Sequence, residues 1–181
     1  WVLLFLLTDL VWYWYHRFSH VVNLFRSVHV VHHQSDDFNY SVSARITVLQ
    51  AIARGLFWSV LPLVGFPPHM ITILLMIHGT YPFFTHTQLV GKLGWIEYIF
   101  VTPSHHRVHH GVNFPYLDKN FGEFFIIWDK MFGSFAEEKE KVVYGIYDHP
   151  QSWNPVRINF HFFIVLWRYA VAAPFWWEKI R

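Results

Sequence analysis

The sequence predicts an all-α fold, an integral membrane helical bundle with a helical hairpin and a histidine-ligated dimetal cap. Hydrophobic residues make up 54% of the 181 residues and charged residues only 14%, whereas soluble domains carry about 25% charged residues. The apolar residues form long runs, and most of the 14 histidines gather at the ends of these runs. Together these observations indicate helices in lipid that carry metal ligands at one membrane face.

Length and composition further limit the number of domains, the class of partner and the types of metal ligand. A chain of this length is expected to form one domain over residues 1–181. It begins with Trp1 inside an apolar run, so we expect a fragment that lacks upstream membrane segments. The net charge is only +2 without a basic stripe, which argues against a nucleic-acid partner. Cysteine is absent, so any metal site must use histidine and carboxylate ligands.

The first apolar run, residues 1–15, is predicted to be a helix that leads into the first histidine cluster. His16 and His20 are four residues apart, which places both rings on one helical face. Asp9 lies seven residues before His16, about two helical turns, and can point the same way. A carboxylate inside an apolar run is a functional candidate, although an aspartate at a helix end near lipid headgroups is the alternative.

The second and third clusters repeat one helical spacing. His29, His32 and His33 follow it, and so do His106, His109 and His110. His105 lies off that face, and Arg107 is expected to meet a phosphate or a carboxylate. A single histidine is more often a structural residue, but this recurring spacing favours metal binding.

A helical hairpin is predicted between the second and third clusters. The apolar runs 44–65 and 69–85 are each about long enough to cross a hydrocarbon core, and a Pro/Gly-rich turn joins them. The hairpin should therefore return His86 to the level of His33. His78 would lie deeper, either packing between helices or near a substrate.

The rest of the chain is more polar before a final apolar run. Asp118 and Asn120 follow the third cluster and are either partners that orient histidine rings or ordinary turn residues. The charged run 137–141 is predicted to be a solvated face. Residues 159–177 are predicted to form a last membrane-associated helix, with an aromatic and charged anchor at 176–179.

The number of histidines favours two metal ions over one. Eight or nine imidazoles exceed what one ion uses, and a zinc hydrolase needs only about three protein ligands. Imidazole suits iron, zinc, copper and nickel, and two ions with open positions fit redox chemistry with O2. An alkyl chain entering from the bilayer could then present a C–H bond in a site from which water is excluded.

Three motifs together resemble the fatty acid hydroxylase/sterol desaturase superfamily. They are Asp9-x-x-Trp12-x-Trp14-x-His16-Arg17-x-x-His20, His29-x-x-His32-His33 and His106-x-x-His109-His110. Within the superfamily, the segments around His86-Thr87, Asp118-Lys119-Asn120 and Trp128-Asp129-Lys130 look most like alkylglycerol monooxygenase and its bacterial relatives.

This resemblance implies a membrane enzyme that uses O2 and two iron ions (Fe2+/Fe3+) to hydroxylate a lipid, here a glyceryl ether, with tetrahydrobiopterin as a further cofactor. It implies a multi-pass protein with the metal site on the cytoplasmic side. The implied ligands are His16, His20, His29, His32, His33, His86, His106, His109 and His110.

Two other readings stay open. The same fold could act as a sterol or fatty-acyl hydroxylase or desaturase, because the ligand set does not separate these reactions. A non-catalytic zinc-binding membrane protein is the alternative of a different class. Such a carrier would distribute its histidines through the depth of its helices, whereas most histidines here lie at helix ends.

Overall fold

The computed structural model describes residues 1–147 and 149–175, and helices are the only regular elements in them apart from one isolated bridge between Phe100 and Phe125. In chain order the elements are α1 (Val2–Val21), α2 (Asn23–His33), α3 (Tyr40–Ser43), α4 (Gln50–Trp58), α5 (Val60–Leu63), α6 (Pro68–Thr85), the 3-10 helix η1 (Gly94–Tyr98), α7 (Pro103–His109), the 3-10 helix η2 (Phe114–Tyr116), α8 (Ile127–Met131) and α9 (Pro155–Ala172). The all-α prediction is confirmed for the described residues.

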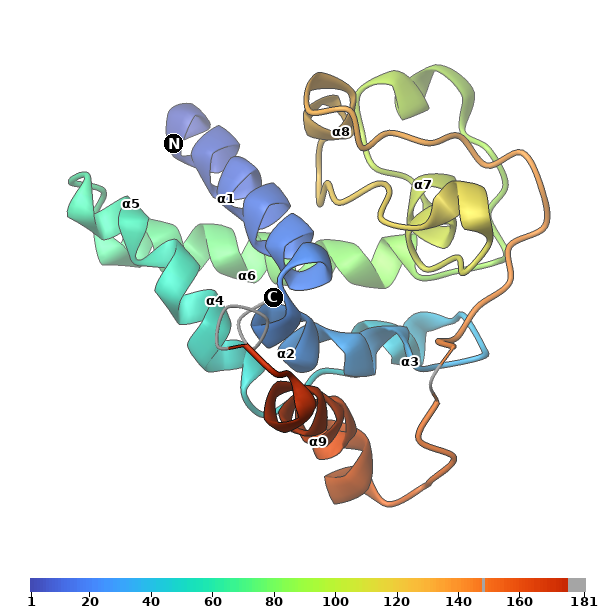
Figure 1. Ribbon diagram of the computed structural model, residues 1–181. Coiled ribbons are helices and arrows are strands. Elements are labelled where there is room, and N and C mark those ends of the chain that lie inside the picture. The colour runs from blue at the N-terminus through green and yellow to red at the C-terminus, as the bar shows by residue number, and fades with distance from the viewer. Residues whose placement is uncertain (148, 176–181) are drawn as a thin grey trace.

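Two long helices, α1 and α6, form the frame of the molecule, and α1 runs across α6 (Figure 1). The main apolar core lies where α1 meets α4, α5 and α6, and it is rich in aromatic and aliphatic side chains. Its buried members are Leu4, Trp12, Tyr15, Trp58, Leu61, Ile71 and Leu74. Burying such side chains supplies most of the stability of the frame.

A sharp turn at Val22 separates α1 from α2. Val22 is extended, with φ −107° and ψ 115°, so α2 folds back against α1 and not onward from it. The predicted helix 1–15 is therefore longer than expected, and it carries both His16 and His20 on its last turns. The turn brings the second histidine cluster, at the end of α2, next to the first.

The predicted hairpin is present, with a more broken first arm than expected. The predicted run 44–65 is not one continuous helix. Residues 44–49 lie before α4 (Gln50–Trp58), and Ser59 separates α4 from the short α5. Pro67 and Pro68 begin α6, since proline fits the first helical positions. His86 follows the last residue of α6 and returns to His32, with 3.1 Å between the two Nε2 atoms.

The third cluster lies on a short helix with strong start signals. Thr102 caps α7, Pro103 is its first residue, and His105 completes a capping box with the Thr102 backbone. Beneath α7, Val108 packs with Tyr116 and Val142 in a second small core. In Figure 1, α7 and α8 form a cap beside one end of α6.

The predicted last helix corresponds to α9, which begins four residues earlier and packs against α2. Asn154 caps it by accepting hydrogen bonds from the backbone of Val156 and Arg157. Between α6 and α7 the chain forms only the short η1, where Trp95 and Tyr98 are exposed. The predicted anchor at 176–179 lies outside the described residues.

Within the described part of the chain, no helix combines the length and the hydrophobicity needed to cross a membrane.

Candidate metal centre

The structure gathers all nine predicted histidines into two adjacent groups. The five-histidine group contains His16, His20, His29, His33 and His109, and the four-histidine group contains His32, His86, His106 and His110. Within each group, one ligand atom per residue lies within 4.8 Å of all the others. The groups touch, since the rings of His33 and His110 stack with centroids 4.3 Å apart.

Four segments of the chain supply these rings. The end of α1 provides His16 and His20, and the end of α2 provides His29, His32 and His33. His86 comes from the C-cap of α6, and α7 with its C-cap supplies the remaining three. Nearly all nine are buried, so helix ends converge on one enclosed volume.

Backbone carbonyls orient three of the rings. Nδ1 of His16 donates to the carbonyl of Phe121 (2.9 Å), Nδ1 of His109 to that of Lys119 (2.9 Å), and Nδ1 of His86 to that of Pro82 (2.6 Å). A carbonyl can only accept, so the proton of each neutral ring lies on Nδ1. Each Nε2 therefore offers a lone pair toward its group, which is the arrangement found in histidine metal ligands.

The Nε2 atoms crowd together in a way that fits bound cations. The Nε2 of His86 lies 3.1 Å from that of His32 and 3.0 Å from that of His106. Because the His86 Nε2 carries no proton, its one lone pair cannot satisfy both neighbours. In addition, the Nε2 atoms of His20, His109 and His110 are buried without a hydrogen-bond partner among residues 1–147 and 149–175. A metal ion in each group would supply the missing partner for these nitrogens.

Burial keeps the rings in the form that binds metal. Loss of solvent lowers the pKa of His106, His109 and His110 well below the usual 6.5, and neighbouring histidines lower each pKa further. Buried imidazoles resist protonation because a charged form would lose its hydration. The neutral ring is the form that ligates a metal.

Of the two predicted partner residues, Asp118 lies next to a histidine ring and Asn120 does not. Asp118 Oδ1 is 3.4 Å from Nδ1 of His20. Asn120 is buried and instead fastens α7 to the following segment, donating to the carbonyls of His105 and Ala136. Both residues have φ of 55°, a conformation that Asp and Asn tolerate better than most residues. This bend directs the intervening Lys119 carbonyl at His109.

Asp9 lies outside both groups and holds a loop. Its carboxylate accepts hydrogen bonds from the backbone of Phe124 (3.0 Å) and Phe125 (3.2 Å) and from the Trp128 indole (2.8 Å). His78 is fully buried with Nδ1 3.6 Å from Asp9 Oδ1. The link to the metal centre is indirect, because the same loop presents the Phe121 carbonyl to His16.

Asp129 is a site residue that sequence reasoning missed. It is fully buried, and it accepts hydrogen bonds from the backbone of Phe121 (2.7 Å) and Gly122 (2.8 Å) and from the Ser134 hydroxyl (2.7 Å). It therefore fixes the peptide that orients His16. The only sequence signal was its position in the Trp128-Asp129-Lys130 motif.

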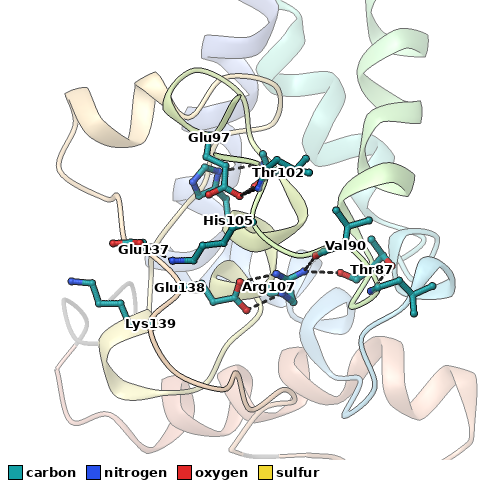
Figure 2. Close-up of polar contacts among 12 residues, drawn as sticks. Thr87, Val90, Glu97, Thr102, His105, Arg107, Glu137, Glu138 and Lys139 are labelled. Carbon is teal, nitrogen blue, oxygen red and sulfur yellow. Dashed lines mark hydrogen bonds and ion pairs between the residues drawn. The ribbon is translucent and has the colours of Figure 1, made fainter. Parts of the chain in front are cut away.

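Arg107 connects α7 to the two segments beside it, as Figure 2 shows. Its guanidinium forms a two-pronged ion pair with Glu138, at 2.8 and 2.7 Å. It also donates to the carbonyls of Thr87 (3.1 Å) and Val90 (2.7 Å), directly after His86. The predicted carboxylate partner of Arg107 is confirmed. Glu138 belongs to the charged run 137–141, so that run is not entirely a solvated face.

Two cavities reach the histidines from different sides. One of about 280 Å³ lies toward α4 and α6, and histidines of both groups line it together with Trp12, Phe83 and Glu123. The other, of about 190 Å³, lies toward α9 and is bordered by Arg26, Asp118, Tyr147 and Phe162. The arrangement could therefore admit two different molecules to one metal centre.

Comparison with known proteins supports the sequence resemblance. Residues 1–134 match the family described as fatty acid hydroxylase. The chain is 41% identical over 179 residues to an alkylglycerol monooxygenase of Homo sapiens, covering 99% of this chain and 40% of that protein. The identity to the Danio rerio alkylglycerol monooxygenase is 43% over 173 residues, covering 93% of this chain and 37% of that protein.

A more distant similarity extends to a second kind of hydroxylase. Cholesterol 25-hydroxylase of Homo sapiens is 28% identical over 139 residues, covering 71% of this chain and 48% of that protein. No solved structure gives a significant match. The chain spans about two fifths of the length of the alkylglycerol monooxygenases that it matches.

Proposed function

Since this chain belongs to the fatty acid hydroxylase family, we propose that it forms the metal-binding domain of an O2-dependent lipid monooxygenase. The observation that carries the proposal is the pair of adjacent histidine groups, each with at least four buried nitrogen ligands. Two groups fit two iron ions, with His16, His20, His29, His33 and His109 holding one and His32, His86, His106 and His110 the other. When bound, such a pair supplies O2 activation and oxidation of a C–H bond.

The chain's own residues prepare the site for this chemistry. Carbonyls of Phe121, Lys119 and Pro82 hold three rings in one tautomer, so the ligands do not reorganise during turnover. Aromatic walls such as Trp12 and Phe83 line the larger cavity and exclude water from the oxidant. This cavity is the proposed lipid site.

Similarity to alkylglycerol monooxygenases supports a glyceryl ether as the first substrate to test. Hydroxylation of the carbon beside the ether oxygen would give a hemiacetal that separates into an aldehyde and a glycerol lipid. We propose a reduced pterin, tetrahydrobiopterin, as the electron donor. The smaller cavity, bordered by Arg26, Asp118 and Tyr147, offers the polar and aromatic groups that a pterin ring would contact.

Placement in a membrane is part of the same proposal. Large apolar side chains are exposed along the hairpin and α9, among them Leu63 (83%), Phe84 (71%) and Trp167 (71%). Exposed apolar surface of this kind is expected where lipid covers it. We propose that residues 1–181 form one domain of a multi-pass integral membrane protein, with the metal centre on the cytoplasmic side.

The test is the metal content of the detergent-solubilised protein after expression with ample iron. One ion per group predicts about two irons per chain. The double variant His109→Ala/His110→Ala removes one ligand from each group and should lose both ions, with loss of O2- and pterin-dependent cleavage of an alkylglycerol. His69→Ala, at an exposed histidine outside the groups, is the matched control and should keep both. Zinc alone in the iron-grown protein would favour the metal carrier, and no metal would end the dinuclear proposal.

A further inference from the structure

The larger cavity has a polar wall that the metal chemistry does not use. Together with the histidines, Glu123, Gln50 and Arg54 line the space of about 280 Å³. None of the three belongs to either histidine group. Cavities that take a purely hydrocarbon ligand have no need of such groups, because unpaired polar groups in a dry site are costly.

Glu123 is the most unusual member of this wall. It is only 5% exposed, and its Oε1 has no hydrogen-bond partner among the residues that the structure describes. Asp9 and Asp129 differ, because each accepts two hydrogen bonds from the backbone and one from a side chain. A buried carboxyl oxygen without a protein partner indicates a position where another molecule supplies the partner.

Gln50 and Arg54 complete the wall from α4. Gln50 is 5% exposed, and its Oε1 also lacks a partner. The Arg54 guanidinium lies 4.3 Å from the ring centroid of Trp12, and it donates no hydrogen bond within the described part of the chain. Stacking on Trp12 fixes the direction of this cation and leaves its N–H groups available to the cavity.

We propose that Glu123, Gln50 and Arg54 form a hydrogen-bonding subsite for an uncharged oxygen-bearing group of the lipid, a hydroxyl or an ether oxygen. The subsite would set which carbon of the alkyl chain lies beside the histidine groups, so these residues determine specificity. The inference rests on the proposed function and adds to it the residues that recognise the polar end of the substrate.

The donor and acceptor pattern selects this chemistry. A hydroxyl can donate to Gln50 Oε1 and accept from Arg54, whereas a carboxylate can only accept and would leave Gln50 Oε1 unpaired. A cationic group would be repelled by the positive charge of Arg54. Burial raises the pKa of Glu123 well above its usual value, the charge of Asp9 raises it further, and Arg54 opposes both. A carboxyl that keeps its proton can donate to an ether oxygen, which has no hydrogen of its own.

The test compares binding of two probes to the metal-loaded, detergent-solubilised protein without O2. One probe is a radiolabelled alkylglycerol, and the other is an alkane of equal chain length. Glu123→Leu should weaken binding of the alkylglycerol about tenfold, the equivalent of one or two hydrogen bonds, and leave alkane binding unchanged. Glu123→Gln, which keeps a donor and an acceptor, should stay within about threefold of the parent protein.

Two further measurements separate recognition from structure. The melting temperature and the iron content of Glu123→Leu should match those of the parent, since Glu123 Oε1 has no protein hydrogen bond to lose. Glu137→Leu, the same change at an exposed carboxylate paired with Lys92, is the matched control. If Glu123→Leu fails to fold, Gln50→Leu tests the same wall from α4 with the same expected loss.

The subsite is refuted if Glu123→Leu and Gln50→Leu bind the alkylglycerol as tightly as the parent, or if both probes weaken equally. It is also refuted if a fatty acid binds better than the alkylglycerol and depends on Gln50 to the same degree. These results differ from failure of the proposed function. A protein without iron or oxygenase activity that still loses alkylglycerol binding in Glu123→Leu would keep the subsite and overturn the oxygenase.

Discussion

Asp129 offers the strongest test of how the segment from Lys119 to Asp129 supports the candidate metal centre. The carboxylate is fully buried, and it accepts three short hydrogen bonds from Phe121, Gly122 and Ser134. Asp129→Asn keeps one oxygen and replaces the other with an NH2 group, which would face an N–H donor. At least one buried donor then loses its acceptor, at a cost of about 1–3 kcal/mol for each donor. We expect the free energy of unfolding to fall by about 2–3 kcal/mol.

A second effect should reach the metal. The Phe121 carbonyl that accepts from His16 belongs to the peptide segment that Asp129 holds, so the substitution should loosen the ring of His16. Loss of such a ligand-orienting contact typically lowers metal affinity about 10- to 100-fold. Because His16 belongs to the five-histidine group, one of the two ions should be affected more than the other.

The assay is denaturant unfolding of the purified protein with and without metal, together with iron affinity by competition with a chelator. Asp37→Asn, the same change at an exposed aspartate, is the control and should change neither quantity. An Asp129→Asn protein with parental stability and parental iron affinity would show that the segment keeps its shape without this carboxylate. The reasoning from hydrogen bonds to ligand orientation would then be wrong.

Two further predictions follow from the same contacts. Asp118→Asn should lower iron affinity about 10- to 100-fold, because the carboxylate at 3.4 Å from His20 Nδ1 would lose its charge. Chelator competition measures this affinity. An unchanged affinity would contradict a role for Asp118 in orienting His20. The double variant His16→Ala/His20→Ala changes the five-histidine group alone, so elemental analysis should show the loss of about one iron per chain. Loss of both ions would show that the two groups do not bind iron independently.

The spacing of the histidines was enough to predict their three helical clusters, and the apolar runs predicted the all-α fold class. Helical geometry relates residues four apart whatever their surroundings, so the end of α1, the end of α2 and α7 could be recognised as clusters. The hairpin prediction then placed His86, because a chain that turns at Pro67 and Pro68 must return to the side it left. Both inferences depend on local geometry that one sequence contains.

The residues that orient the ligands could not be predicted in the same way. The carbonyls of Pro82, Lys119 and Phe121 act through the backbone, and no side-chain type marks them. Glu123 lies in an irregular segment and Asp129 in the short helix α8 that follows it, and the burial of both depends on how this part of the chain folds over α1. In the sequence Glu138 does not differ from the solvated charges beside it, and only the folded structure shows that it pairs with Arg107.

The two HxxHH motifs, at 29–33 and 106–110, explain how adjacent histidines come to lie in two different groups. Neighbouring residues on a helix point about 100° apart, whereas residues four apart return to nearly the same face. His29 and His33 accordingly share the five-histidine group, and His32 turns to the other one. In α7 the sense is reversed, because His106 and His110 share the four-histidine group and His109 crosses over.

Each motif therefore gives histidines to both groups, and together the two motifs hold the groups in contact. A single HxxxH pair on each helix could bind one ion but would leave the second group short of nitrogens. The added histidine in each motif is what links the two sites, since one rigid helix then positions ligands for both. Replacing His109 and His110 together should consequently affect both ions, whereas replacing His16 and His20 on α1 reaches the five-histidine group alone.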